Sequence, residues 1–96
     1  MWFINLKDLQ MRILVTHKVK SLEEFFSASF KKERHEFFSD FAKNINEFVS
    51  ADNTVAIIAD VFDENILLQK RSSNENLALM SKHGVSIESM KFFKKT

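Results

Sequence analysis

The sequence predicts a single α+β domain of the ferredoxin-like type, with its elements in the order βαββαβ. Three observations support this prediction. The chain has 96 residues, enough for one domain and too few for two. Its apolar residues recur with the period of a strand in some segments and with that of a helix in others. The order of these segments is typical of a four-stranded antiparallel sheet that carries both helices on one face.

The first strand is expected over 12–20, where apolar and polar residues alternate. Every second residue shares one face, namely Ile13, Val15, His17 and Val19. Ser21 and Glu24 then form a capping box, so one long helix is expected to begin there. Its apolar side consists of Leu22, Phe25, Phe26, Phe30, Phe37 and Phe41. Its solvated side consists of Lys31, Lys32, Glu33, Arg34 and Glu36.

The second half of the unit is expected to contain two strands, a helix and a last strand. The strands cover 44–50 and 54–62, joined by a turn at Ala51-Asp52-Asn53. Asp63 is the predicted N-cap of a helix over 64–71, which Ser72-Ser73 interrupt and restart. Leu77 and Met80 are expected to face inward in the restarted part. This helix is expected to end at His83, with Gly84 in the C′ position, and the last strand to cover 86–93.

Residues 1–10 precede this unit and are treated as an N-terminal extension, so the domain proper covers 11–96. Met11 is a plausible start directly before the first strand. Two interpretations of the extension stay open. In the first, the extension forms a short amphipathic turn that packs on the domain or its partner through Trp2, Phe3, Leu6 and Leu9. In the second, the extension has no structural role.

The third strand is apolar on both faces. Val55, Ile57, Ala59 and Val61 point one way, whereas Ala56, Ile58 and Phe62 point the other, interrupted by Asp60. Two helices cover one side of a four-stranded sheet, so the second side needs another layer. A homodimer that packs sheet against sheet would supply it, with Ile58 and Phe62 in the interface. The alternative is that the N-terminal segment or the chain end covers this face.

Composition excludes several classes of function. The net charge of +1 provides no general attraction to nucleic acid or to an anionic membrane. The absence of cysteine excludes disulfides, thiol nucleophiles and cysteine-based metal centres. The longest apolar run, Val55–Ala59, is far shorter than the roughly 20 residues of a membrane span. We therefore expect a cytoplasmic protein without a cofactor, whose partners include neither nucleic acid nor membrane.

Several short segments resemble the dimeric α+β barrel proteins related to antibiotic-biosynthesis monooxygenases, especially their cyclase-like members. These segments are Leu14–Val19, Leu22 with Phe25, Asp52–Val55, Leu77–Met80 and His83–Val85. The resemblance covers 11–93 and implies a sheet-to-sheet dimer with a ligand cleft between sheet and helices. Several such proteins have no known function. The Asn, Trp and His set of the haem-degrading members is not recognisable, because the one tryptophan is Trp2.

His17 is the main candidate for a functional residue, because it shares a strand face with apolar residues. An imidazole there is either a general base or ligand contact, or a hydrogen-bonded structural group. His35, among charged residues, is expected at the surface, and His83 at a helix C-terminus. The three histidines lack metal-ligand spacing, so no metal site is predicted.

Three functions are consistent with these residues. The first is a homodimer that holds a small apolar ligand between helices and sheet, lined by His17, Phe25, Phe26 and Phe30. The second is a cofactor-independent monooxygenase or cyclase-like enzyme in which His17 acts on an aromatic or polyketide-like substrate. The third is a protein-interaction module with a filled core. A pocket of a few hundred Å³ beside His17 would favour the first two.

Overall fold

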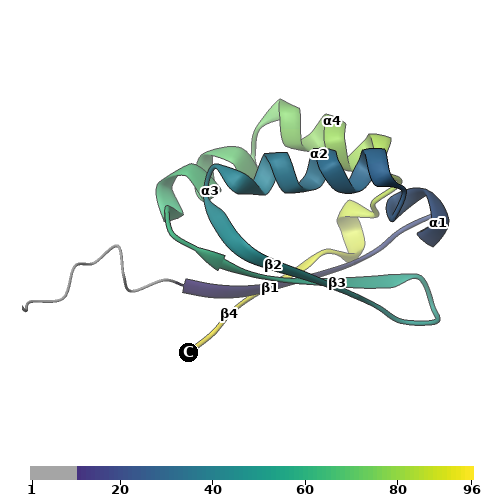
Figure 1. The fold of residues 1–96 in the computed structure, drawn as a ribbon, viewed down its shortest axis with the longest axis horizontal. Helices are drawn as coiled ribbons and strands as arrows, with labels where there is room; N and C mark the ends of the chain where they lie inside the picture. Colours follow the sequence, from purple (N-terminus) through teal and green to yellow (C-terminus); the bar gives the residue numbers. More distant parts are fainter. Residues whose placement is uncertain (1–10) are drawn as a thin grey trace, which may run out of the picture.

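A computed structural model describes residues 11–96, so the predictions for residues 1–10 lie outside the described part of the chain. The chain forms a four-stranded antiparallel sheet in the order β2-β3-β1-β4. The four α-helices of residues 11–96 lie on one face of this sheet, and Figure 1 shows the other face open below it. The predicted α+β class, four-stranded sheet and helical face are confirmed. One chain forms an open sheet over residues 11–96, and not a closed barrel.

The sheet is built around its two central strands. β1 (Met11–Lys18) pairs with β3 (Thr54–Val61) along its whole length, with His17 opposite Val55. β2 (Ala42–Val49) borders β3, and β4 (Lys91–Lys94) borders β1. The turn between β2 and β3 uses Asn53 at φ 64°, a conformation that asparagine tolerates.

The first helical segment differs from the single helix that the sequence predicted. Ser21 caps α1 (Leu22–Phe25) as expected, but this helix ends after one turn. Ser27 then caps a second helix, α2 (Ala28–Ser39), by accepting a hydrogen bond from the Phe30 amide. The reason is local: the Ser27 hydroxyl satisfies an amide that a continuous helix would have bonded to a carbonyl.

The second helical segment follows the prediction in its caps and its interruption, but Leu77, expected to face inward, is 44% exposed, whereas Met80 does face the core side. Asp63 caps α3 (Glu64–Arg71), and Ser73 caps α4 (Asn74–Lys82). Gly84 follows at φ 69°, which only glycine adopts without strain. The last strand is shorter than predicted, because a 3₁₀ turn (Ile87–Ser89) occupies its first part. The Ser89 hydroxyl donates a hydrogen bond to the Ser86 carbonyl and accepts one from the Lys18 amide, which ties this turn to the end of β1.

Two clusters of buried residues fill the space between sheet and helices. One contains Ile13, Phe41, Ala42, Ala59, Val61 and Leu67. The other contains Val19, Phe25, Val55 and Ile57. Odd-numbered residues of β3 face this core, as the alternation predicted. None of the helices within 11–96 is both long and apolar enough to cross a membrane.

Candidate functional site

A cavity of about 270 Å³ lies between the sheet and the helices. Its lining includes members of both core clusters, so it borders both parts of the core. Most of the lining is apolar: Ile13, Val15, Phe25, Phe37, Phe38, Phe41, Ile57, Leu67, Leu79, Met80, Val85, Met90 and Phe92. The polar residues are His17, Arg34, Arg71, Asn76 and His83. The cavity is therefore an apolar space with a few hydrogen-bonding groups, which is the usual character of a small-molecule site.

His17 reaches this cavity from the central strand β1. It is 4% exposed, and its Nδ1 is buried without a hydrogen-bond partner. Burial lowers the pKa of His17 to about 4, and the positive charge of Arg34 acts in the same direction. The Lys18 backbone and the Glu47 carboxylate oppose this shift. His17 is consequently a neutral imidazole at physiological pH, able to accept or donate one hydrogen bond from Nδ1.

Phe25 lies beside His17 and is fully buried. The two rings meet edge to face with their centroids 5.4 Å apart. Phe25 also contacts the ring of His83 at 6.1 Å, and Phe30 stacks on the other side of His83 at 4.0 Å. These aromatic contacts fix the orientation of both imidazoles.

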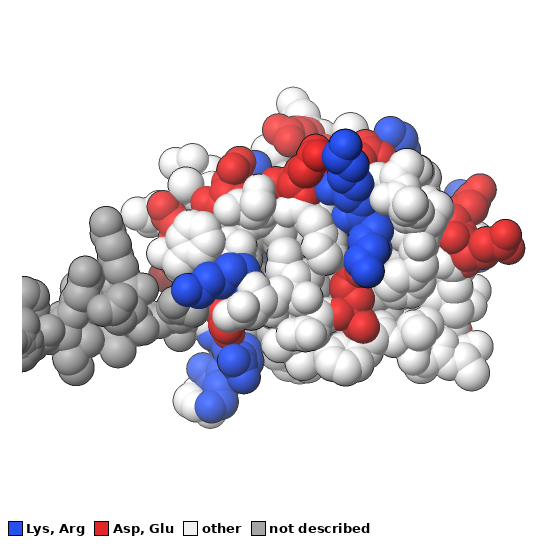
Figure 2. Space-filling view, viewed as in Figure 1, with Lys and Arg blue, Asp and Glu red and all other residues white. Residues whose placement is uncertain are grey.

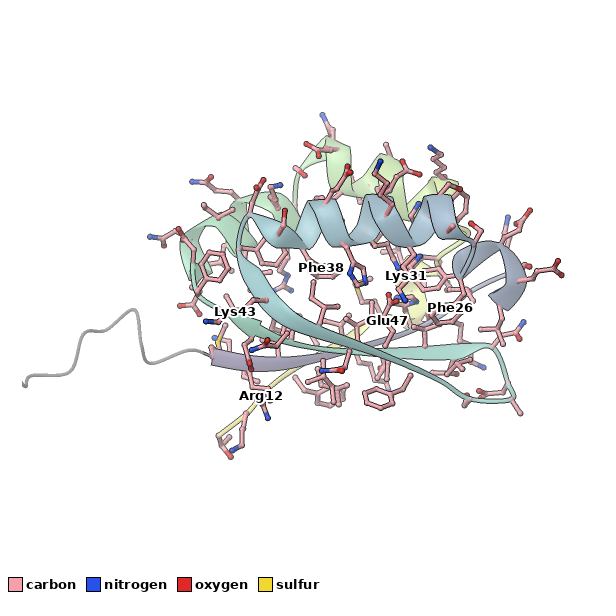
Figure 3. The ribbon with its side chains drawn as sticks, in the orientation of Figure 1. Arg12, Phe26, Lys31, Phe38, Lys43 and Glu47 are labelled. Atoms are coloured by element: carbon pink, nitrogen blue, oxygen red, sulfur yellow. The ribbon has the colours of Figure 1, made fainter. Side chains whose placement is uncertain are left out.

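An ion pair that the sequence did not predict supports this cluster from the helix side. Arg34 of α2 is 4% exposed, although its charge suggested the solvated side of the helix. Its Nε lies 2.8 Å from Oε2 of Glu47 on β2, and its Nη2 lies 3.2 Å from Oε1. Its Nη1 donates to the Phe25 carbonyl, and its guanidinium carbon lies 3.8 Å from the Phe25 ring centroid. Figure 3 shows Glu47 between α2 and the sheet.

His83 contributes a second buried imidazole to the cavity. It caps the C-terminus of α4, as predicted, and is 3% exposed. Its Nε2 lies 3.6 Å from Oε1 of Glu33, beyond hydrogen-bond distance. Burial lowers the pKa of His83, whereas Glu33 acts in the opposite direction. Its sequence context indicates a helix cap and gives no sign that it lies near His17.

Two of the four predicted ligand contacts line the cavity and two do not. His17 and Phe25 are among the lining residues, whereas Phe26 and Phe30 are not. Phe26 is the C-cap of α1, and its ring packs edge to face on Phe25 at 5.1 Å. Phe30 is directed to His83 instead. The break between α1 and α2 changes the helical phase at this point, which is why the predicted stripe of phenylalanines does not face one space.

The face of the sheet away from the helices carries an apolar row that crosses β3, β1 and β4. Leu14 pairs with Ile58 on one side and Phe93 on the other. Phe48 lies on the same face of β2, opposite Ala56, and is 53% exposed. Figure 2 shows charged side chains over the helices and at the lower left, whereas the rest of the lower edge is uncharged. Phe62 follows the last residue of β3 and is 42% exposed.

A polar group borders this apolar row at one end. Arg12 and Asn44 both donate hydrogen bonds to the Asp60 carboxylate, at 2.8 and 3.0 Å. These hydrogen bonds hold the pKa of Asp60 below its usual value. Figure 3 shows Arg12 on the side of the sheet opposite the helices. Asp60 therefore belongs to the outer face and does not meet His17.

The fold is shared with solved structures. A crystal structure of an antibiotic biosynthesis monooxygenase is 10% identical, with a TM-score of 0.63, and the match covers 90% of this chain and 96% of that one. A structural-genomics structure of protein YJCS is 12% identical, with a TM-score of 0.62, over 91% and 99%. Rv0793 from Mycobacterium tuberculosis is 9% identical, with a TM-score of 0.51, over 90% and 93%. No family model and no curated protein matches the sequence significantly.

This likeness confirms the fold that the sequence resemblance implied, and at such low identity it concerns the fold alone. Within residues 11–96, no group of three or more histidine or carboxylate side chains is arranged to hold a metal ion.

Proposed function

We propose that this chain is a homodimeric protein that binds a small apolar molecule in the cavity between helices and sheet. The observation that carries the proposal is the buried Nδ1 of His17, which has no hydrogen-bond partner and belongs to a residue that lines a cavity of about 270 Å³. A buried polar atom without a partner costs free energy. A ligand that offers a hydrogen bond at this point would remove that cost.

The size and lining of the cavity define the ligand further. Ligand pockets in proteins usually measure about 300–1,000 Å³, so this cavity of about 270 Å³ suits a small molecule of up to about three rings. Its lining is mostly aliphatic and aromatic, so burial of apolar surface would supply most of the affinity. A cavity of this kind counts against an interaction module with a filled core.

Filling the cavity is expected to abolish ligand binding. Leu79 of α4 lines the cavity, and Leu77 on the same helix is 44% exposed and does not. We expect Leu79→Trp to weaken binding of the fluorescent probe N-phenyl-1-naphthylamine by at least about tenfold, because the indole takes the space of the probe. The measurement is a fluorescence titration of the folded protein.

Leu77→Trp is the matched control and is expected to bind the probe like the unchanged protein. Circular dichroism would establish that both variants are folded. The proposal would be wrong if the unchanged protein showed no saturable binding, or if the two tryptophan variants bound equally well.

A cofactor-independent monooxygenase or cyclase-like enzyme is the second candidate. It is supported by the shared fold with an antibiotic biosynthesis monooxygenase and by the position of the His17 imidazole in the cavity. The lowered pKa leaves this imidazole unprotonated, although it also makes it a weaker base than a free imidazole. His17→Ala separates the two candidates in assays with hydroxylated aromatic compounds. Lost turnover with retained binding favours the enzyme, whereas unchanged turnover excludes His17 as its base.

The dimer is proposed from the apolar row on the open face of the sheet. Burying a large apolar side chain completely stabilises a protein by roughly 1.5–3 kcal/mol. A monomer would forgo part of this stabilisation at Leu14, Phe48, Ile58 and Phe93. A second sheet related by two-fold symmetry would cover them, with Phe62 at the edge of the contact. The dimeric state is a proposal that this face supports.

A charge in this row is expected to separate the protomers. We expect the unchanged protein to sediment as a dimer at micromolar concentration and Ile58→Glu as a monomer, because the carboxylate would be buried without a partner. Leu68→Glu, on α3 and 52% exposed, is the matched control and is expected to stay dimeric. A monomeric unchanged protein, or a dimeric Ile58→Glu, would contradict the proposal.

A further inference from the structure

The polar residues around the cavity share one electrostatic property. They are two arginines, two histidines and one asparagine, and no carboxylate is among the described lining residues. Every one of these side chains offers a hydrogen-bond donor in at least one of its forms. The lining therefore favours a ligand that carries acceptor oxygens, and it favours negative over positive charge.

The two arginines differ in how their charge is compensated. Arg34 is buried and already forms two contacts with the Glu47 carboxylate, so its charge is neutralised within the fold. Arg71, the last residue of α3, has no carboxylate within 4.0 Å among residues 11–96. The uncompensated positive charge of the lining is thus that of Arg71.

Arg71 also lies where the cavity meets solvent. It is the one exposed residue of the described lining, whereas the others are buried or half-buried. Its guanidinium carbon lies 4.5 Å from the ring centroid of Phe92 on β4, a cation–π contact that holds the side chain between helix and sheet. The Asn76 side chain donates to the Arg71 carbonyl at 3.0 Å, which fixes the backbone between α3 and α4.

We propose that the ligand is a small amphiphilic anion, whose apolar body fills the cavity and whose carboxylate or similar acidic group binds Arg71 at the opening. This inference rests on the proposed ligand-binding function and adds the charge of the ligand to it. A guanidinium that stacks on an aromatic ring still offers two parallel N–H donors to an oxyanion, a geometry that a neutral ligand does not use. The body of the same ligand reaches His17 in the buried part of the cavity.

Two probes with the same body test the charge directly. 8-Anilinonaphthalene-1-sulfonate and N-phenyl-1-naphthylamine share a phenylaminonaphthalene body, and only the first is an anion. We expect Arg71→Gln to raise the Kd of the sulfonate roughly tenfold and that of the neutral amine less than about twofold. The measurement is a fluorescence titration of both probes at low and at physiological salt.

Lys32→Gln is the matched control, because it removes one exposed positive charge from α2, away from the cavity. It is expected to leave the Kd of both probes unchanged within about twofold. The charge proposal would be overturned if Arg71→Gln affected both probes equally, affected neither, or acted no more strongly than Lys32→Gln. In those cases ligand binding itself would stand. If neither probe bound the unchanged protein, the proposed function would fail together with this inference.

Discussion

Arg34→Met is expected to lower the free energy of unfolding by about 3–5 kcal/mol, the cost of breaking a buried ion pair from one side. The side chains of Arg34 and Glu47 are 5% and 7% exposed, so the variant would leave the Glu47 carboxylate buried without its partner. It would also remove the donor to the Phe25 carbonyl. Urea unfolding followed by circular dichroism, at one fixed protein concentration, measures this change.

Two controls separate the buried charge from the loss of packing. Arg34→Met combined with Glu47→Met removes both charges and is expected to recover much of the stability that the single variant loses. Lys94→Met removes one partner of the Lys94–Glu64 pair, whose side chains are 58% and 51% exposed, and is expected to cost less than about 1 kcal/mol. Our interpretation of the pair would be wrong if Arg34→Met cost no more than Lys94→Met.

Capping residues and strand alternation made most of the fold predictable. Ser21, Asp63 and Ser73 each begin a helix, and each accepts a hydrogen bond from the backbone three residues on. Such signals are local, because the cap and the amide that it bonds are neighbours in the sequence. Alternation predicted that His17 shares a strand face with Ile13, Val15 and Val19, and this residue is buried on β1. Which face of the sheet that is did not follow from the sequence; the structure places His17 on the helix side.

The errors concern places where a competing local bond or a distant residue decides the structure. Ser27 was not recognised as a second cap, so α1 and α2 were predicted as one helix. The second strand starts at Ala42, earlier than predicted, because Asn44 at φ 55° forms an irregularity that keeps both halves paired with β3. Asparagine adopts this conformation readily, so the strand continues through it.

Arg34 shows most clearly what the sequence leaves undetermined. It lies four residues after Phe30 and four before Phe38, so helical spacing alone placed it on the apolar side of α2. Its charge outweighed that signal, because an arginine is rarely buried without a partner. The partner, Glu47, comes from β2, and which residue of β2 faces α2 depends on pairing that the sequence does not show. The cavity is likewise a product of packing, and no local pattern predicts its volume.

Acidification from pH 6.5 to 4 is expected to lower the stability of the protein by about 3 kcal/mol through His17 alone. Its pKa falls from 6.5 in the unfolded chain to about 4 in the fold, so between these values the unfolded state binds one more proton. The stabilisation is complete above pH 6.5 and decreases by about 1.4 kcal/mol per pH unit until the folded pKa is reached. Urea unfolding at intervals from pH 7.5 to 4.5 measures this slope and covers most of the change.

His17→Leu isolates this contribution, because it removes the titrating group and keeps an apolar side chain in the core. On acidification, the free energy of unfolding of this variant is expected to fall less steeply than that of the unchanged protein. His83 does not account for the difference, since its lowered pKa acts in the same direction in both proteins. The carboxylates of Asp60 and Glu33, whose pKa values are lowered, lose their stabilisation mainly at still lower pH. Parallel pH profiles for the two proteins would show that the His17 imidazole is not held neutral by burial. In that case the hydrogen-bonding state assumed for its Nδ1 in the cavity would also be wrong.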